Sequence, residues 1–144
     1  MKIGIASDHR GYILKQKLIK YLEKKYQVKD YGTNNTERTD YPIYAFALSN
    51  GVLKKEVDFG IAICGTGIGI SIACNKIRGI YCAKIDNIKE AKLSKEHNNA
   101  NIIAFKGTTR FKKAKKMIDS YIEAKFLNQE PHLKRIALIK EKEK

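Results

Sequence analysis

Several residue types are rare in this sequence, and each shortage argues against a class of protein. The 144 residues include no tryptophan, two prolines and three cysteines, and the longest apolar run, residues 61–72, is interrupted by glycines. Three cysteines without Cys-x-x-Cys or Cys/His ligand spacing favour neither a disulfide framework nor a zinc site. The apolar run is too short to span a bilayer, and the N-terminal MKIGIAS predicts a strand instead of a signal peptide. We therefore expect one cytoplasmic domain, residues 1–144, with no membrane partner.

Acidic residues are scarce relative to basic ones, and the formal net charge is +14. Such a charge raises the possibility of nucleic-acid binding, but 24 of the 29 basic residues are lysines, which recur along every predicted helix. No nucleic-acid-binding motif accompanies them. The lysines are therefore expected to solvate outer helix faces, and we predict no nucleic-acid partner. The same positive field would still attract small anions.

Short apolar segments alternate with segments of helical periodicity along the whole chain. Strands are predicted at residues 2–6, 28–31, 58–64, 79–85 and 101–105, and helices at residues 11–25, 42–55, 87–96, 111–126 and 131–144. A further helix is predicted to start within the glycine-rich residues 65–69 and to end at residue 76. This alternation predicts an α/β fold, with a five-stranded parallel sheet covered by helices on both faces. Such folds bind ligands at the carboxyl ends of their strands.

The segment ICGTGIGIS, residues 63–71, follows the third predicted strand and is rich in glycine. Alternating glycines let the backbone come close to another group, and the N-terminus of the helix that follows attracts anions. The segment lacks the Gly-Lys-Ser/Thr of a P-loop, and residue 70 is isoleucine where a dinucleotide fingerprint requires glycine. A tight turn without any ligand is the alternative interpretation.

Cys64 differs from the other two cysteines in its position at the end of a strand. Backbone N–H groups and a positive helix terminus beside it would favour a thiolate, which serves as a nucleophile or a base. Cys74 and Cys82 are expected to be small buried hydrophobes. The chain has three histidines, and all fall in predicted loops or at the ends of elements: His9, His97 and His132. Their positions favour a shared site.

Four motifs together resemble those of the type B ribose-5-phosphate isomerases: ASDHRG at 6–11, ERTDYP at 37–42, CGTGIGISIACNK at 64–76 and KEHNNANI at 95–102. Galactose-6-phosphate and allose-6-phosphate isomerases belong to the same superfamily. The resemblance implies a Rossmann-like three-layer α/β/α sandwich with strand order 2-1-3-5-4. It also implies a phosphorylated sugar as substrate, no cofactor or metal, and a homodimer or dimer of dimers with active sites between subunits.

The resemblance also assigns roles to individual residues. It makes Cys64 the base and His97 the acid that opens the sugar ring, with Thr66 and Asp8 as further catalytic residues. Residues implied to contact the sugar or the enediolate are His9, Tyr41, Gly65, Gly67, Ile68, Gly69 and Asn98. Residues implied to hold the phosphate are Arg110, His132 and Arg135.

Two departures from the family pattern concern the phosphate site. Pro131 stands where the Arg-His-x-x-Arg motif usually has its first arginine, and the turn FKGTTR at 105–110 is longer than usual. The first departure leaves isomerisation of a 6-phosphohexose as an alternative. A cysteine hydrolase that forms an acyl-enzyme and a non-catalytic nucleotide-binding module are further alternatives. The segment 131–144 has one narrow apolar stripe, which suits docking on a second subunit: Leu133, Ile136 and Ala137.

Overall fold

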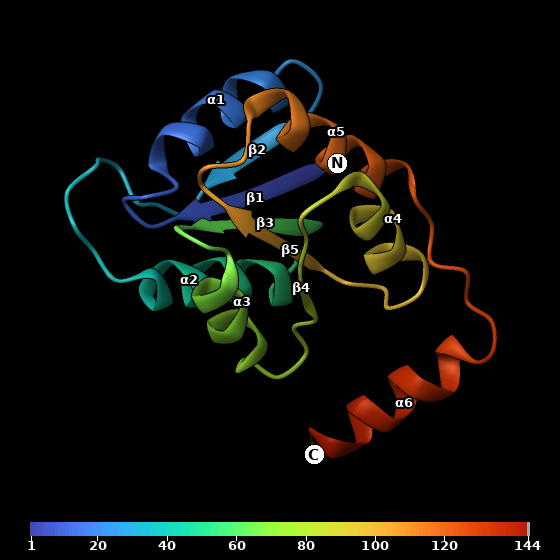
Figure 1. The fold of residues 1–144 in the computed structure, drawn as a ribbon. Coiled ribbons are helices and arrows are strands. Elements are labelled where there is room, and N and C mark those ends of the chain that lie inside the picture. The colour runs from blue at the N-terminus through green and yellow to red at the C-terminus, as the bar shows by residue number, and fades with distance from the viewer. Residues whose placement is uncertain (144) are drawn as a thin grey trace.

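Five parallel strands form the centre of the computed structural model, which describes residues 1–143. Their order across the sheet is β2-β1-β3-β5-β4, as expected (Figure 1). The strands are β1 (Lys2–Ser7), β2 (Gln27–Asp30), β3 (Phe59–Cys64), β4 (Cys82–Lys84) and β5 (Ile102–Lys106). The helices are α1 (Tyr12–Leu22), α2 (Tyr41–Leu53), α3 (Ile68–Asn75), α4 (Ile88–Glu96), α5 (Phe111–Glu123) and α6 (His132–Lys142).

Helices cover both faces of the sheet and create two apolar cores. One core joins the sheet to α1, α4 and α5, and the other joins it to α2 and α3. The central strand β3, with the sequence FGIAIC, is buried at all six positions because helices pack on both of its faces. In α1, the leucines spaced four apart, Leu14, Leu18 and Leu22, all lie in the first core. The predicted three-layer α/β/α architecture is confirmed.

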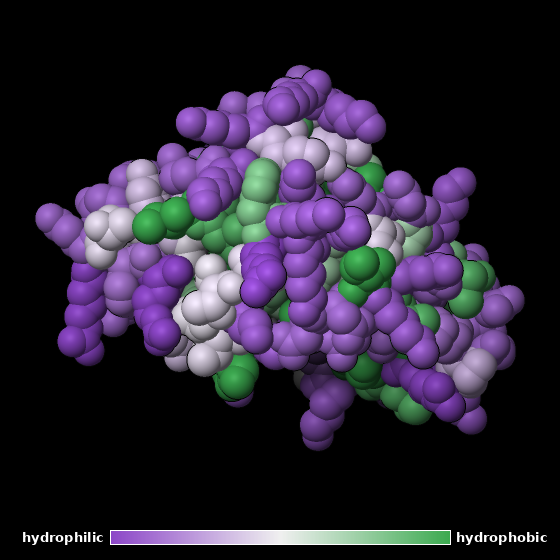
Figure 2. Space-filling view, turned by 45° about the horizontal axis from the view of Figure 1, so that its top comes forward, coloured by the Kyte–Doolittle hydropathy of each residue, from purple (hydrophilic) through white to green (hydrophobic). Residues whose placement is uncertain are grey.

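The lysines lie mainly on the outer surfaces of the helices. In α5, the buried face consists of Ala114, Met117, Ile118 and Tyr121, and all four lysines of the helix lie outside that face. The face shown in Figure 2 is accordingly mostly hydrophilic, with hydrophobic residues scattered among charged ones. No helix within residues 1–143 is long and apolar enough to cross a membrane.

The structure corrects several predicted boundaries. Strand β4 covers three residues instead of the predicted seven. Before it, the Tyr81 N–H donates to the side-chain oxygen of Asn101 at 2.8 Å, instead of to the backbone of a neighbouring strand. Helix α5 ends at Glu123, and the chain then turns extended at Ala124. Tyr41, predicted in a loop, is the first residue of α2, with Pro42 beside it in the first turn.

Helix α6 stands apart from the sheet. An extended segment connects it to α5, and the helix runs beside the main body (Figure 1). None of its residues is buried, and Leu138 is 60% exposed. Ile136 is half-buried, whereas Leu133 and Ala137, the rest of the predicted stripe, are exposed. Residue 144, the end of the predicted final helix, lies outside the described residues.

Candidate active site

The carboxyl ends of three neighbouring strands bring the first group of predicted residues together. Ser7 at the end of β1 pairs with Ile63, and Cys64 at the end of β3 pairs with Lys106 at the end of β5. The Asp8 N–H continues this alignment by donating to the Ile63 carbonyl at 3.2 Å. The loops that follow these strands therefore meet at one edge of the sheet, as the rule for ligand sites in parallel sheets requires.

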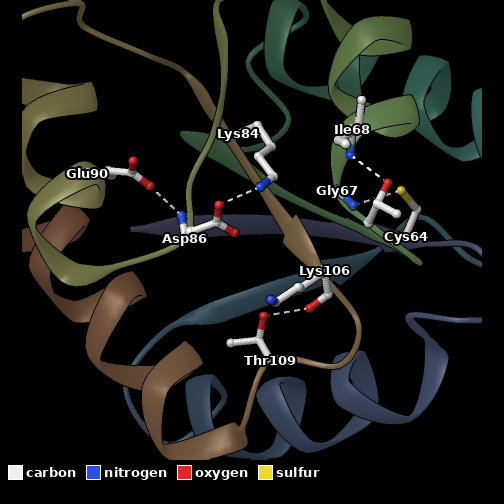
Figure 3. A network of polar contacts seen from close by, with 9 residues as sticks. Cys64, Gly67, Ile68, Lys84, Asp86, Glu90, Lys106 and Thr109 are labelled. Carbon is white, nitrogen blue, oxygen red and sulfur yellow. Dashed lines mark hydrogen bonds and ion pairs between the residues drawn. The ribbon is translucent and has the colours of Figure 1, made fainter.

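Cys64 lies at the centre of this edge, and its side chain is held by the loop that follows. The cysteine is 3% exposed, and the Gly67 N–H donates to its Sγ atom at 3.2 Å (Figure 3). Gly67 adopts a left-handed φ of 78° just before α3. A Cβ atom at Gly67 would also lie 2.8 Å from the backbone of Phe105, so only glycine fits this position. The sulfur is thus fixed at the N-terminus of a helix.

The same loop presents further backbone donors. Thr66 is exposed, and its Oγ1 atom accepts from the Ile68 N–H at 3.1 Å, which leaves the hydroxyl hydrogen free to donate. Within residues 1–143, the N–H groups of Gly65 and Gly69 have no protein acceptor. The loop therefore offers donors beside the thiol, a geometry suited to an oxygen that gains negative charge.

Gly65 and Gly69 make room for side chains from other parts of the chain. A Cβ atom at Gly65 would lie 2.5 Å from Nη1 of Arg10, and one at Gly69 would lie 2.5 Å from Cζ of Tyr41. The sequence suggested that these glycines admit a ligand, whereas the structure fills the space with protein groups. Tyr41 is thereby placed against the loop, and its contact with the sugar stays a prediction. Arg10 was missed, although it lies inside the ASDHRG motif.

Asp8 and His9 follow β1 and hold the turn that leads into α1. Asp8 is 5% exposed, and its Oδ1 atom accepts from the N–H groups of Arg10 at 2.9 Å and Gly11 at 3.1 Å. His9 accepts a hydrogen bond from the Thr39 N–H at Nδ1, over 3.2 Å. Since Nδ1 is an acceptor there, the proton of the neutral ring sits on Nε2, which makes His9 a donor.

The second group of predicted residues lies at the opposite edge of the sheet. His97 is the C-terminal cap of α4, and the exposed Asn98 lines a hollow together with Asp58 and Gly79, which precede β3 and β4. These residues therefore lie near the amino ends of the strands. The His97 ring stacks on that of His132 from α6, with centroids 4.2 Å apart and planes inclined by 14°. Two of the three histidines expected in one site are thus in direct contact, whereas His9 lies at the carboxyl ends of the strands, after β1.

The far end of α6 is fastened to the same edge. The Tyr81 hydroxyl donates to Glu143 at 2.7 Å, and the Gly79 N–H donates to the other carboxylate oxygen at 3.1 Å. Burial and this hydrogen bond raise the pKa of Tyr81 to about 12. The hydrogen bond from the Tyr81 hydroxyl, together with the one from the Gly79 N–H, holds the pKa of Glu143 below its ordinary value. Between these contacts and the His97–His132 stack, a groove of about 540 Å³ lies under the helix, lined in part by Ile136 and Ile139.

The predicted site residues of one chain thus fall into two sets. We call the set at the carboxyl edge, built around Cys64, the carboxyl-edge half; it also includes Arg110, the N-cap of α5 just after β5. We call His97, Asn98, His132 and Arg135 the amino-edge half. Cys64 pairs with Lys106, the last residue of β5, which lies four positions after Ile102, the first. The two ends of that strand are therefore about 13 Å apart. One chain does not bring Cys64 and His97 together.

The remaining cysteines belong to neither half. Cys74 is buried in α3, where its thiol contacts Cys82 of β4, and this contact together with burial raises the pKa of Cys82. The expectation of a buried hydrophobe holds for Cys74, whereas Cys82 is half-buried at the groove under α6. Within residues 1–143, no three His, Cys, Asp or Glu side chains are grouped as ligands for a metal ion.

Comparison with known proteins gives a consistent result over nearly the whole chain. The family model described as Ribose/Galactose Isomerase matches residues 3–139. Ribose-5-phosphate isomerase B of Escherichia coli is 42% identical over 127 residues, which cover 87% of this chain and 85% of that protein. A galactose-6-phosphate isomerase subunit of Clostridium acetobutylicum is 40% identical over 128 residues, with coverages of 88% and 74%.

The fold also matches those of solved structures closely. The structure of ribose-5-phosphate isomerase B from Clostridium thermocellum aligns with a TM-score of 0.96 and 43% identity, and covers 99% of this chain and 97% of that chain. The Mycoplasma genitalium protein, solved with bound ribulose-5-phosphate, aligns with a TM-score of 0.92 and 36% identity, with coverages of 99% and 95%.

Proposed function

This chain belongs to the ribose/galactose isomerase family, as its four motifs predicted, and from that premise we propose that it interconverts ribose 5-phosphate and ribulose 5-phosphate. Relatives named ribose-5-phosphate isomerase B support the choice of sugar. The observation that carries the chemistry is the buried Cys64 thiol at the N-terminus of α3, beside backbone donors without a protein acceptor. Family membership favours isomerisation over the hydrolase and nucleotide-binding alternatives.

The reaction moves one proton from C2 to C1 of the open-chain sugar and one hydroxyl proton from O2 to O1. It passes through an enediolate, in which the oxygens carry negative charge. Cys64, as the thiolate, takes the proton from C2 and returns it at C1. The N–H groups of Gly65 and Gly69, together with the Thr66 hydroxyl, donate to the charged oxygens. These donors are fixed before the substrate arrives, because the loop is held by β3 and α3.

Asp8 and His9 bind the sugar beside this centre. One Asp8 oxygen is occupied by the turn into α1, and the other accepts from a sugar hydroxyl. His9 donates from Nε2, because its Nδ1 atom accepts from the Thr39 N–H. Tyr41, packed against Gly69, closes the other side of the loop. The roles of Asp8 and His9 are contacts with substrate oxygens, and the proton transfer stays with Cys64.

The site is completed by a second copy of the chain. Cys64 and His97 lie at opposite edges of one sheet, so the ring-opening acid must come from another subunit. Helix α6 supports this arrangement, because it carries exposed apolar side chains and covers a groove without being buried itself. The amino-edge half of one subunit then faces the carboxyl-edge half of its partner in a homodimer or a dimer of dimers. Arg135 and His132 hold the phosphate from that side, and Arg110 from the other.

Two measurements test the proposed function. Exchange of the C2 proton of ribose 5-phosphate with solvent deuterium should occur with the wild type and be abolished in Cys64→Ala. Cys74→Ala, which removes another buried thiol, should retain exchange and serves as the control. Near-normal exchange in Cys64→Ala would contradict the assignment of the base. Assays of ribose, allose and galactose phosphates side by side identify the sugar, and a preference for a 6-phosphohexose would replace ribose 5-phosphate as the substrate.

A further inference from the structure

The Arg10 side chain lies over the first glycine of the catalytic loop. A Cβ atom at Gly65 would lie 2.5 Å from Nη1, 2.6 Å from Cζ and 2.8 Å from Nε of Arg10. The whole guanidinium group therefore occupies the space that a side chain at residue 65 would take. Gly65 directly follows Cys64, and consecutive Cα atoms are about 3.8 Å apart. The cation thus lies beside the residue proposed to move the proton.

The backbone of Arg10 is held on both sides. Its N–H donates to Asp8 Oδ1 at 2.9 Å, and its carbonyl packs against Gly107, where a Cβ atom would clash with it. The β1–α1 turn and the β5–α5 loop therefore fix the point from which the side chain extends. An exposed arginine held in this way loses less conformational freedom when it binds a ligand than a freely moving one.

The charge of Arg10 is available for an anion. No ion pair within residues 1–143 includes Arg10. The nearby Asp8 carboxylate accepts from the Arg10 backbone N–H and not from the guanidinium. An arginine presents several N–H donors in a planar fork, which matches two neighbouring oxygens on one ligand. The two adjacent oxygens of a cis-enediolate have that arrangement.

We propose that Arg10 is a further substrate-binding residue, whose guanidinium binds the two oxygens at the reacting end of the sugar as they gain charge in the enediolate. This inference rests on the proposed function and adds a residue to it. Because the charge develops only during proton transfer, Arg10 binds the transition state more strongly than the substrate. Its loss therefore lowers kcat more than it raises KM.

The test compares Arg10→Met with Lys20→Met, which removes an exposed cation from the outer side of α1. Arg10→Met should lower kcat by about ten- to a hundredfold, the range for a lost charge-assisted hydrogen bond, with KM and inhibition by inorganic phosphate nearly unchanged. Lys20→Met should match the wild type. Unchanged kcat in Arg10→Met would identify a solvated surface charge and overturn the inference. Weakened phosphate inhibition with kcat retained would also overturn it, since the arginine would then hold the phosphate.

Gly65→Ala tests the geometry independently. The methyl group of the new alanine would take the place of the guanidinium, so this variant should lower kcat to a similar extent. The kcat of the double variant with Arg10→Met should be no lower than that of the more affected single variant. Losses that multiply would show that Arg10 does not act from above Gly65. Failure of the wild type to exchange the C2 proton would overturn the proposed function itself. A wild type that exchanges, with Arg10→Met fully active, would overturn only the role of Arg10.

Discussion

The base and the carboxylate of the carboxyl-edge half are buried at strand ends, whereas the amino-edge half lies on helix ends. Cys64 and Asp8 are 3% and 5% exposed, and main-chain N–H groups contact the side chains of both. His97 caps the end of α4, and the helix that carries its partner His132 has no buried residue. The sheet therefore holds the groups proposed for proton transfer, and the groups proposed for ring opening and phosphate binding depend on contacts outside the core of the chain.

This difference has a physical rationale. Proton abstraction requires the base and the oxyanion donors to be fixed relative to each other to well within an ångström, and a strand end next to a helix N-terminus provides that fixity. Ring opening and phosphate binding tolerate a looser frame, because a histidine and an arginine reach the substrate through flexible side chains. A helix that docks on a second copy can supply them.

Within the amino-edge half, the largest effect is expected when the acid is lost. His97→Asn should reduce turnover of ring-forming ribose 5-phosphate by roughly a hundred- to ten-thousandfold, the usual contribution of general acid–base catalysis. Proton exchange of a four-carbon aldose phosphate, which forms no furanose ring, should fall far less, because the carboxyl-edge half is intact. Rates on both substrates are the measurement, with Lys89→Met on the same helix as the control. Equal losses would place His97 in enolisation or in the fold.

A smaller effect is expected for the phosphate. Arg135 is exposed on α6, three residues after His132 and thus on the same side of the helix. Arg135→Ala should raise KM by about ten- to a hundredfold, with inhibition by inorganic phosphate weakened in parallel. Lys134→Ala, which removes the neighbouring cation, should change both quantities much less. Unchanged phosphate inhibition in Arg135→Ala would move the anion to another site, with the loop of residues 65–69 as the first candidate.

The smallest expected effect concerns the attachment of α6. Hydrogen bonds from Tyr81 and Gly79 hold the pKa of Glu143 below its ordinary value of 4.5. A lowered carboxylate pKa means that ionised Glu143 stabilises the docked helix above that value, and the stabilisation is lost as the pH falls through the folded pKa. The Gly79 amide resonance should therefore titrate below pH 4.5 in NMR spectra.

Two variants sharpen this measurement. Glu143→Gln should abolish the titration of the Gly79 amide, because the titrating group is gone. Tyr81→Phe should move its midpoint upward, toward the ordinary value, since the Tyr81 hydrogen bond is the main cause of the lowered pKa. A Gly79 resonance that titrates identically in wild type and Glu143→Gln would contradict the contact between this carboxylate and the amino edge.

The fold was predictable because its signals are local in the sequence. The apolar run of β3, the leucines of α1 and the glycine loop before α3 each define an element within a short window, and their alternation predicts the parallel sheet. The end of α5 was less predictable, because its apolar pattern continues through Phe126 while the chain leaves the helix at Glu123. Tertiary contacts decide such boundaries: the Leu127 N–H donates to the Glu96 carbonyl at 3.0 Å.

The members of the candidate site can be proposed from the sequence, but their arrangement cannot. Cys64 and its loop follow a recognisable strand, so their shared edge could be inferred. The contacts of Arg10 with Gly65 and of Tyr41 with Gly69 span 55 and 28 residues of sequence, and no local pattern indicates them. The separation of His97 from Cys64 likewise follows from the direction of α4 relative to the sheet. These relations depend on how elements pack, which a single sequence does not encode in any short segment.

Mixing two inactive variants tests the shared site most directly. Cys64→Ala lacks the base and His97→Asn lacks the acid, and each homodimer should have low activity on ribose 5-phosphate. If each site combines the carboxyl-edge half of one subunit with the amino-edge half of its partner, a heterodimer contains one intact site and one doubly altered site. After denaturation and joint refolding at equal amounts, random pairing should restore about a quarter of the wild-type activity, since half the dimers are mixed and each has one working site. Activity that stays at the level of the separate variants would contradict a site built from two copies.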